Sequence, residues 1–203
     1  MSTAQIIRYV AGSYRTNVYL VYDDETKDAF IVDPGYEFQK IYDDIERLQL
    51  DPKYIILTHG HGDHTGGIDL LKKTFPKIKL CASVKERKFL YDRDKSMGKG
   101  GITADIELKD GDEMSVGPIK LKFISTPGHT PGGMCILMGD VLFSGDTLFR
   151  MSVGRTDMPG GDQELLFDSI TEKLFILPNS TTVLPGHDEA TTIGIEKRYN
   201  PFV

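Results

Sequence analysis

The sequence contains no tryptophan, only two cysteines and no apolar run long enough to span a membrane. These shortages count against a membrane protein and a disulfide-stapled scaffold. Cys81 and Cys135 each lie in an apolar stretch, without a CxxC partner or a neighbouring histidine. We therefore predict that both are small buried hydrophobic residues.

Basic residues are also in short supply. The chain has 24 Lys and Arg against 30 Asp and Glu, a formal net charge of −6, and no basic run exceeds a pair. This balance argues against a nucleic acid or an anionic membrane as partner. The opening residues MSTAQIIRYVAGSYR lack the basic head and apolar block of an export signal, so we expect a cytoplasmic protein.

The remaining composition is that of an ordinary globular protein. Hydrophobic residues make up 39% of the 203 residues and charged residues 27%. A chain of this size and composition is expected to form one domain over residues 1–203, with a core that needs no disulfide. Nothing in the sequence indicates whether the chain self-associates.

The apolar pattern predicts alternating strands and helices arranged in two halves. In the first half we expect a hairpin, a helix, a buried strand, a helix and a strand, at residues 18–22 with 29–32, 37–49, 54–57, 68–75 and 79–82. Ser83 and Glu86 have the spacing of a capping box that opens a short helix. Residues 96–103 are glycine-rich and are expected to form a surface loop.

The second half repeats this alternation. We expect strands, a helix and a final strand, at residues 119–123, 134–138, 141–144, 162–176 and 182–184. Gly139 and Asp140 separate two of these strands and predict a tight hairpin. Polar turns follow several strands directly, and these turns hold the residues of chemical interest.

All five histidines fall in three short polar turns. The turns are THGHGDHTGG with His59, His61 and His64, TPGHTPGG with His129, and PGHD with His187. Imidazole is the commonest metal ligand at neutral pH, and the glycines allow the backbone to turn tightly enough to aim several side chains at one point. Asp63 adds a carboxylate to the first turn, which favours zinc, iron or manganese over a thiolate-preferring metal.

Two further aspartates lie at predicted strand ends. Asp146 follows the strand VLFSG, where a lone aspartate is usually a turn or N-cap residue. Asp33, in IVDPG, either orients a ligand histidine or forms an Asx-turn. Spacing alone does not decide the role of either residue.

The ordered series VDPG, THGHGDHTGG, TPGHTPGG, SGDTLF and PGHD resembles the five motifs of the metallo-β-lactamase superfamily, from about residue 17 to the C-terminus. The resemblance implies an α/β (α+β) fold, a four-layer αββα sandwich of two pseudo-symmetric halves with two divalent metal ions at one edge. Zinc is the favoured ion, with iron or manganese as alternatives. The implied ligands are His59, His61 and His129 for one ion, and Asp63, His64 and His187 for the other, with Asp146 bridging.

Within that superfamily, residues 145–162 and 185–202 resemble the short bacterial hydroxyacylglutathione hydrolase, or glyoxalase II, type. This implies a thioesterase that cleaves S-lactoylglutathione or a related hydroxyacyl thioester with a metal-activated water, which Asp63 and Asp146 orient. Arg150 and Arg155 are candidate contacts for a substrate carboxylate, although Arg155 is equally suited to an ion pair with Asp157. Only residues 188–203 follow His187, so the glutathione site on the helical C-terminal domain of full-length glyoxalase II does not transfer.

Other readings remain open. A persulfide dioxygenase with a single iron held by His59, His129 and Asp146 resembles the chain in the same motifs. A lactonase and a non-catalytic metal-binding module are further alternatives. A secreted β-lactamase is disfavoured by the lack of an export signal and by the presence of His64 beside Asp63.

Overall fold

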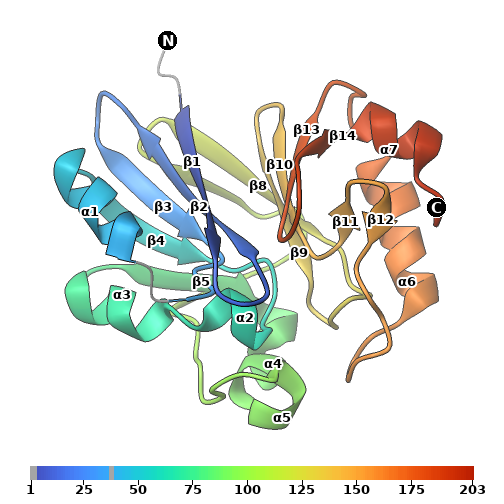
Figure 1. The fold of residues 1–203 in the computed structure, drawn as a ribbon, viewed down its shortest axis with the longest axis horizontal. Coiled ribbons are helices and arrows are strands. Elements are labelled where there is room, and N and C mark those ends of the chain that lie inside the picture. The colour runs from blue at the N-terminus through green and yellow to red at the C-terminus, as the bar shows by residue number, and fades with distance from the viewer. Residues whose placement is uncertain (1–3, 37–38) are drawn as a thin grey trace.

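Two mixed β-sheets of six strands each lie face to face in the computed structural model, which describes residues 4–36 and 39–203 (Figure 1). The first sheet has the order β1 (Ala4–Ala11), β2 (Thr16–Asp23), β3 (Asp28–Val32), β4 (Asp51–Ile56), β5 (Lys79–Ser83) and β6 (Ile106–Leu108). The second has the order β14 (Thr191–Thr192), β13 (Thr182–Pro185), β10 (Val141–Gly145), β9 (Met134–Met138), β8 (Ile119–Ser125) and β7 (Glu113–Val116). A small hairpin, β11 (Leu148–Phe149) and β12 (Ser152–Val153), stands beside the second sheet.

Helices cover the outer face of each sheet. They are α1 (Gln39–Arg47) and α3 (Ile68–Thr74) on the first sheet, and α6 (Gln163–Asp168), a π-helical continuation (Ser169–Leu174) and α7 (Ile193–Tyr199) on the second. Three short helices, α2 (Gly62–Thr65), α4 (Arg87–Tyr91) and α5 (Arg93–Ser96), lie at the ends of the first-half strands. The predicted four-layer αββα sandwich is therefore confirmed.

Three buried clusters separate the four layers. Strand β2 shows why: Leu20 packs on the helical side of the first sheet, while Tyr19 and Val21 face the second sheet. This is the two-residue alternation of a strand whose faces are both buried. Phe143 of β10 joins the sheets, with its ring centroid 5.2 Å from that of Tyr19 and 6.4 Å from that of Phe30.

Most predicted elements are confirmed. Residues 37 and 38, where the first predicted helix begins, lie outside the described residues, and α1 occupies residues 39–47. The predicted helix at 162–176 is α6 with its π-helical continuation, capped by the Asp162 side chain, which accepts from the Leu165 N–H. Ser96 ends α5 instead of opening the predicted loop.

The cysteine prediction is also confirmed. Cys81 and Cys135 are buried and neither forms a disulfide. Burial raises the pKa of the Cys81 thiol to about 12 and that of Cys135 to about 11, so neither is a reactive thiolate at neutral pH.

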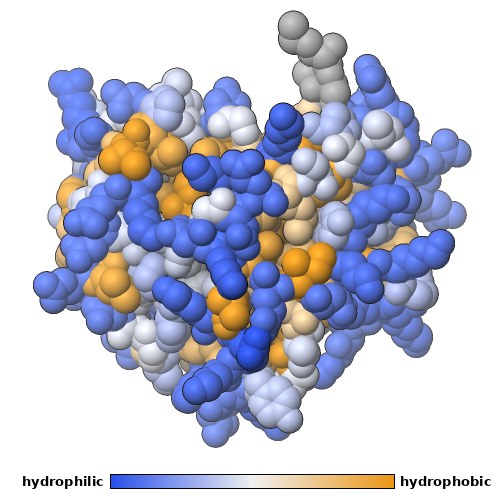
Figure 2. Space-filling model, turned by 180° about the vertical axis from the view of Figure 1, so that it is seen from behind, coloured by the Kyte–Doolittle hydropathy of each residue, from blue (hydrophilic) through white to orange (hydrophobic). Residues whose placement is uncertain are grey.

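No helix within residues 4–36 and 39–203 has both the length and the apolar character needed to cross a bilayer. On the face turned away in Figure 1, apolar patches are small and separated by hydrophilic side chains (Figure 2). Scattered exposed apolar residues of this kind are normal on a folded protein.

Strand direction gathers the polar turns at one edge. Strands β3, β4 and β5 run parallel, as do β10 and β13, so the carboxyl ends within each set meet at the same edge of their sheet. Asp33 follows β3 and His59 follows β4; Asp146 and His187 follow β10 and β13. Residues distant in sequence thus meet where the two sheets end together.

Candidate metal centre

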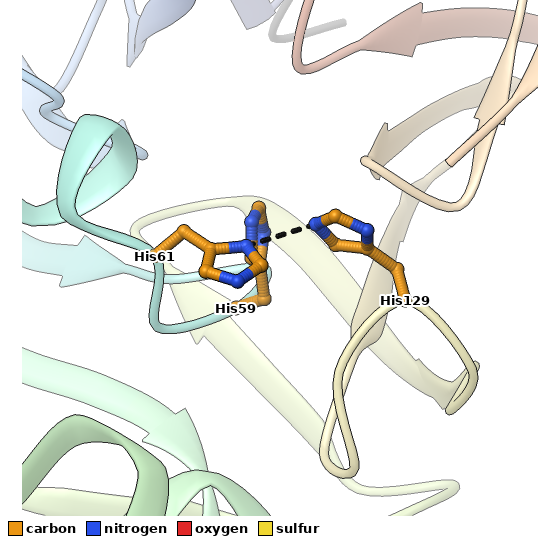
Figure 3. A group of neighbouring side chains, drawn as sticks. All are labelled: His59, His61 and His129. Carbon is orange, nitrogen blue, oxygen red and sulfur yellow. Dashed lines mark hydrogen bonds between the residues drawn. The ribbon is translucent and has the colours of Figure 1, made fainter. Parts of the chain in front are cut away.

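The first cluster consists of His59, His61 and His129. One nitrogen from each ring lies within 4.8 Å of the other two. His61 Nδ1 and His129 Nε2 are 2.9 Å apart, and the His59 ring centroid is 4.9 Å from that of His61 and 4.8 Å from that of His129. Figure 3 shows His59 and His61 leaving one loop and His129 another, with the rings directed at one another.

The second cluster consists of Asp63, His64 and His187. Asp63 Oδ2 lies 3.3 Å from His187 Nε2 and 3.5 Å from His64 Nε2. The two imidazole nitrogens are themselves 3.4 Å apart. Helix α2 supplies Asp63 and His64, and the turn after β13 supplies His187.

Asp146 lies between the two clusters. Its carboxylate oxygens are 3.5 Å from His129 Nε2, 3.4 Å from His64 Nε2 and 3.5 Å from His187 Nε2. The structure therefore brings together all seven residues that the resemblance implied as ligands. Asp146, which spacing alone did not single out, is at the middle of the group.

Asp33 supports His64 directly and His59 through the Thr58 hydroxyl. Its Oδ2 accepts from the Thr58 hydroxyl at 2.6 Å and lies 3.0 Å from His64 Nδ1. Because the Thr58 hydroxyl gives its proton to Asp33, His59 Nδ1, 3.1 Å away, is left to donate to that hydroxyl oxygen. Of the two alternatives for Asp33, the geometry favours the one that orients ligand histidines.

Backbone carbonyls hold two more histidines. His129 Nδ1 donates to the Arg155 carbonyl at 2.7 Å, and His187 Nδ1 donates to the Tyr14 carbonyl at 3.0 Å. A carbonyl can only accept, so the proton on each Nδ1 is fixed and Nε2 is the atom that faces the centre. Sequence reasoning missed both contacts, because a backbone acceptor has no residue signature.

These contacts fit a divalent cation. His59 Nε2 and Asp146 Oδ1 are buried and have no hydrogen-bond partner among the described residues. Buried polar atoms left in this state are rare and call for an explanation, such as a bound ion. Five imidazoles with two carboxylates form a donor set that suits zinc, iron or manganese.

Two histidines of the first cluster are in the protonation state that binds a cation at neutral pH. Burial lowers the pKa of His59 well below its usual value, and the nearby His64 adds to the effect. Burial, helped by His129, lowers the pKa of His61 to about 4. Both rings are neutral at pH 7, and a neutral imidazole is the form that binds metal.

The two histidines of the second cluster, by contrast, are protonated at neutral pH. Burial acts to lower the pKa of His64, but the charges of Asp146 and Asp33 outweigh it and raise the pKa to about 9. Burial likewise opposes the rise at His187, where hydrogen bonds to Asp146 and Asp63 bring the pKa to about 10. At Asp63 burial acts to raise the pKa, yet the hydrogen bond to His187 outweighs it and the pKa falls to about 2.

This difference predicts how metal loading depends on pH. His64 and His187 must each release a proton to bind an ion, so protons compete more strongly as the pH falls. Between about pH 8 and pH 6 we expect the second cluster to lose about tenfold in affinity per pH unit for each proton released, and the first cluster to lose less. Calorimetric zinc titrations in two buffers of different ionisation enthalpy measure the protons released. If the zinc affinities of the two clusters depended equally and weakly on pH, the predicted difference would be contradicted.

A pocket of about 430 Å³ opens onto the centre. Asp63, Asp146, His61, His129 and His187 form its polar floor, and its walls include Tyr14, Met97, Phe149, Val153, Arg155 and Met158. Met97 comes from the glycine-rich loop after α5, which reaches the site because Gly98 packs against Gly62. That loop, expected only to lie at the surface, thus forms part of the pocket wall.

The two candidate substrate arginines are placed differently. Arg155 lines the pocket, and its side chain also makes two 2.7 Å hydrogen bonds to Asp157, the ion pair that was the other expectation for it. Arg150 pairs with Glu189 and is not among the described residues that line the pocket. Arg155 is therefore the better placed of the two to meet a substrate carboxylate.

Comparison with known proteins agrees with the fold. The sequence matches the metallo-beta-lactamase superfamily over residues 11–187. Hydroxyacylglutathione hydrolase GloC of Haemophilus influenzae is 37% identical over 201 residues, covering 94% of each chain.

Three solved structures are similar over nearly the whole chain. BLEG-1 B3 metallo-beta-lactamase has a TM-score of 0.91 and 37% identity, covering 98% of this chain and 99% of its own. TTHA1623 in a di-iron-bound form has a TM-score of 0.85 and 32% identity, covering 97% and 100%. ETHE1 from Myxococcus xanthus has a TM-score of 0.82 and 31% identity, covering 97% and 83%. The chain belongs to the metallo-β-lactamase superfamily.

Proposed function

We propose that the protein is a binuclear metallohydrolase, a thioesterase that cleaves S-lactoylglutathione or a related small hydroxyacyl thioester. The observation that carries this proposal is the position of Asp146 between two three-residue clusters that together use every histidine of the chain. Because residues from both sheets are needed for this one centre, we further propose that residues 1–203 act as a single domain.

The proposed metal ligands are His59, His61 and His129 for one ion and Asp63, His64 and His187 for the other, with Asp146 shared. A divalent cation held by these residues would supply Lewis-acid polarisation of a carbonyl and would make a water acidic enough to lose its proton near neutral pH. Zinc is the favoured ion. Iron is supported as an alternative by the similarity to TTHA1623, which was solved in a di-iron-bound form.

Asp63 is the proposed orienting group for the attacking water. Its carboxylate lines the pocket, and its pKa of about 2 keeps it ionised at neutral pH. An ionised carboxylate accepts a hydrogen bond from water and aims the oxygen at an acyl carbon held in the pocket. Thr16, whose hydroxyl donates to Asp63 Oδ2 at 3.1 Å, holds that carboxylate in place.

The leaving group favours a thioester over an amide. A departing thiolate, whose parent thiol has a pKa of about 8.5, needs no proton, whereas a departing amine does. All five histidines already lie in the two clusters, so none is free to donate that proton. The similarity to a protein named hydroxyacylglutathione hydrolase supports the same substrate class.

The residues that line the pocket support a glutathione-like carrier thiol. Arg155 lines the pocket, and we propose that its guanidinium, which also pairs with Asp157, meets one carboxylate of a glutathione-like substrate. Tyr14, Phe149 and Met158 offer apolar surface. BLEG-1, whose structure is similar to this one, is named a B3 metallo-beta-lactamase. A β-lactam is therefore the competing substrate.

A side-by-side assay tests the proposal. One metal-loaded preparation is given S-lactoylglutathione, a chromogenic β-lactam, a lactone and glutathione persulfide, with thiol release, ring opening and oxygen consumption recorded. We expect thioester turnover to exceed the other three reactions by kcat/KM. Oxygen uptake on the persulfide without thioester cleavage, from protein holding one iron per chain, would replace the proposal with the dioxygenase alternative.

A further inference from the structure

Glu86 is a buried carboxylate outside the seven-residue set. Glu86 is the last residue of a short 3₁₀ turn (Val84–Glu86) after β5, and it is only 1% exposed. The capping box predicted for this turn forms only in part. Ser83 caps it, accepting from the Lys85 N–H, while Glu86 turns away from the cap and into the protein.

The Glu86 carboxylate contacts the two loops that hold the first cluster. Its Oε1 accepts from the Gly132 N–H at 2.7 Å. Burial raises its pKa. Its Oε2 lies beside Gly60 and has no hydrogen-bond partner among the described residues. Gly60 lies between His59 and His61, and Gly132 comes three residues after His129, so a single side chain lies against both loops.

The approach is close on both loops. A Cβ on Gly132 would lie 2.5 Å from the Glu86 backbone nitrogen, so this position requires glycine, and a Cβ on Gly60 would lie 2.8 Å from Glu86 Oε2. Since the first loop follows β4 of one sheet and the second follows β8 of the other, the contact spans the two halves of the fold.

The next helix completes the support. Phe89 of α4 places its ring centroid 5.2 Å from that of His61 in an edge arrangement. Leu90 of the same helix packs against Gly60. Residues 86–90 therefore pack against the loop that carries His59 and His61, two of the three histidines shown in Figure 3.

We propose that Glu86 is a positioning residue that sets the separation of the His59–His61 loop and the His129 loop, and thereby the metal affinity of the first cluster. The inference rests on the proposed metal site. It adds a residue that contacts no ligand nitrogen and belongs to none of the five motifs. Loss of a hydrogen bond made directly to a metal ligand weakens metal binding by about 10- to 100-fold, and we expect an effect in the same range here.

Two substitutions separate the anchoring contact from the charge. Glu86→Ala removes the acceptor and leaves the Gly132 N–H unpaired. Glu86→Gln keeps an acceptor oxygen at the same reach without the charge. Glu86→Asp keeps the carboxylate but withdraws it by one methylene, so it supplies a second test should Glu86→Ala fail to fold.

A matched control is available in Glu196. It is also fully buried, and its carboxylate accepts from the Thr191 hydroxyl, the Met151 N–H and the Asn200 amide. None of these partners belongs to either cluster. Glu196→Ala therefore reports the effect of general destabilisation on metal binding.

The experiment measures zinc affinity of the first cluster alone. Every variant is made with His187→Ala, which disables the second cluster, and metal-free protein is titrated with zinc against a chromophoric chelator. We expect Glu86→Ala and Glu86→Asp to bind zinc about 10- to 100-fold more weakly, and Glu86→Gln and Glu196→Ala to remain close to the His187→Ala parent.

Three results would overturn the role of Glu86. They are parental zinc affinity in a folded Glu86→Ala or Glu86→Asp protein, an equal loss in Glu196→Ala, and a loss in Glu86→Gln as large as in Glu86→Ala. If the unsubstituted protein fails to bind two ions, that result would instead overturn the proposed function. The two failures are therefore distinguishable.

Discussion

Replacing Asp63 with alanine is expected to lower kcat for thioester hydrolysis by about 10²- to 10³-fold, the usual effect of deleting one group that is preorganised for the transition state. Asp63 lies 3.3 Å from His187 Nε2, faces the pocket and is ionised at neutral pH. The substitution removes both a proposed ligand of the second ion and the carboxylate that orients water. Steady-state kinetics with S-lactoylglutathione, together with metal content per chain, measure the two effects.

The matched control is Asp24→Ala, which removes an exposed aspartate paired with Lys27. It is expected to leave kcat unchanged. In Asp63→Ala the first cluster is intact, so the protein should still hold one ion. Thioester turnover that survives in Asp63→Ala at the parental rate would refute the two-metal mechanism.

Removing the metals is expected to abolish hydrolysis and to lower the melting temperature by about 8–16 °C for each ion removed. One ion present at about a thousand times its Kd stabilises the native state by about 4 kcal/mol, and each kcal/mol shifts the Tm of a domain of this size by about 2–4 °C. The metal-free centre also keeps Asp63, Asp146 and Asp33 close together, where protonated His64 and His187 offset part of their charge. Scanning calorimetry before and after chelation, then after zinc is restored, gives the shift.

The control for chelation is the double variant His59→Ala, His61→Ala. It lacks two ligands of the first cluster, so zinc should raise its Tm by less than it raises that of the unsubstituted protein. If chelation left the Tm and the turnover of the unsubstituted protein unchanged, the centre would hold no structural or catalytic metal.

Much of the centre could be predicted from the sequence, because its residues cluster in short glycine-rich turns. Three histidines within six positions need little tertiary information to converge. The alternation of strands and helices was equally accessible, since apolar runs of strand length and helical length alternate along the chain, whereas the four layers were implied by the family resemblance. Asp146 is different: its turn has no neighbouring histidine, so only its family resemblance pointed to the middle of the centre.

Apart from that of Asp33, the contacts that aim the ligands could not be predicted. The carbonyls of Tyr14 and Arg155 hold His187 and His129, yet any residue type offers a carbonyl. Glu86 fits a local capping pattern, but a tertiary partner, the Gly132 N–H, draws its side chain away. In each case a contact between segments distant in sequence decides the outcome, and single-sequence patterns do not encode such contacts.

The most direct test of the binuclear centre is a crystal structure of zinc-loaded protein, with anomalous difference density recorded on both sides of the zinc absorption edge. We predict two peaks per chain, one among His59, His61 and His129 and one among Asp63, His64 and His187, with the Asp146 carboxylate between them. A single peak in fully loaded protein, or two peaks that Asp146 does not touch, would contradict the account.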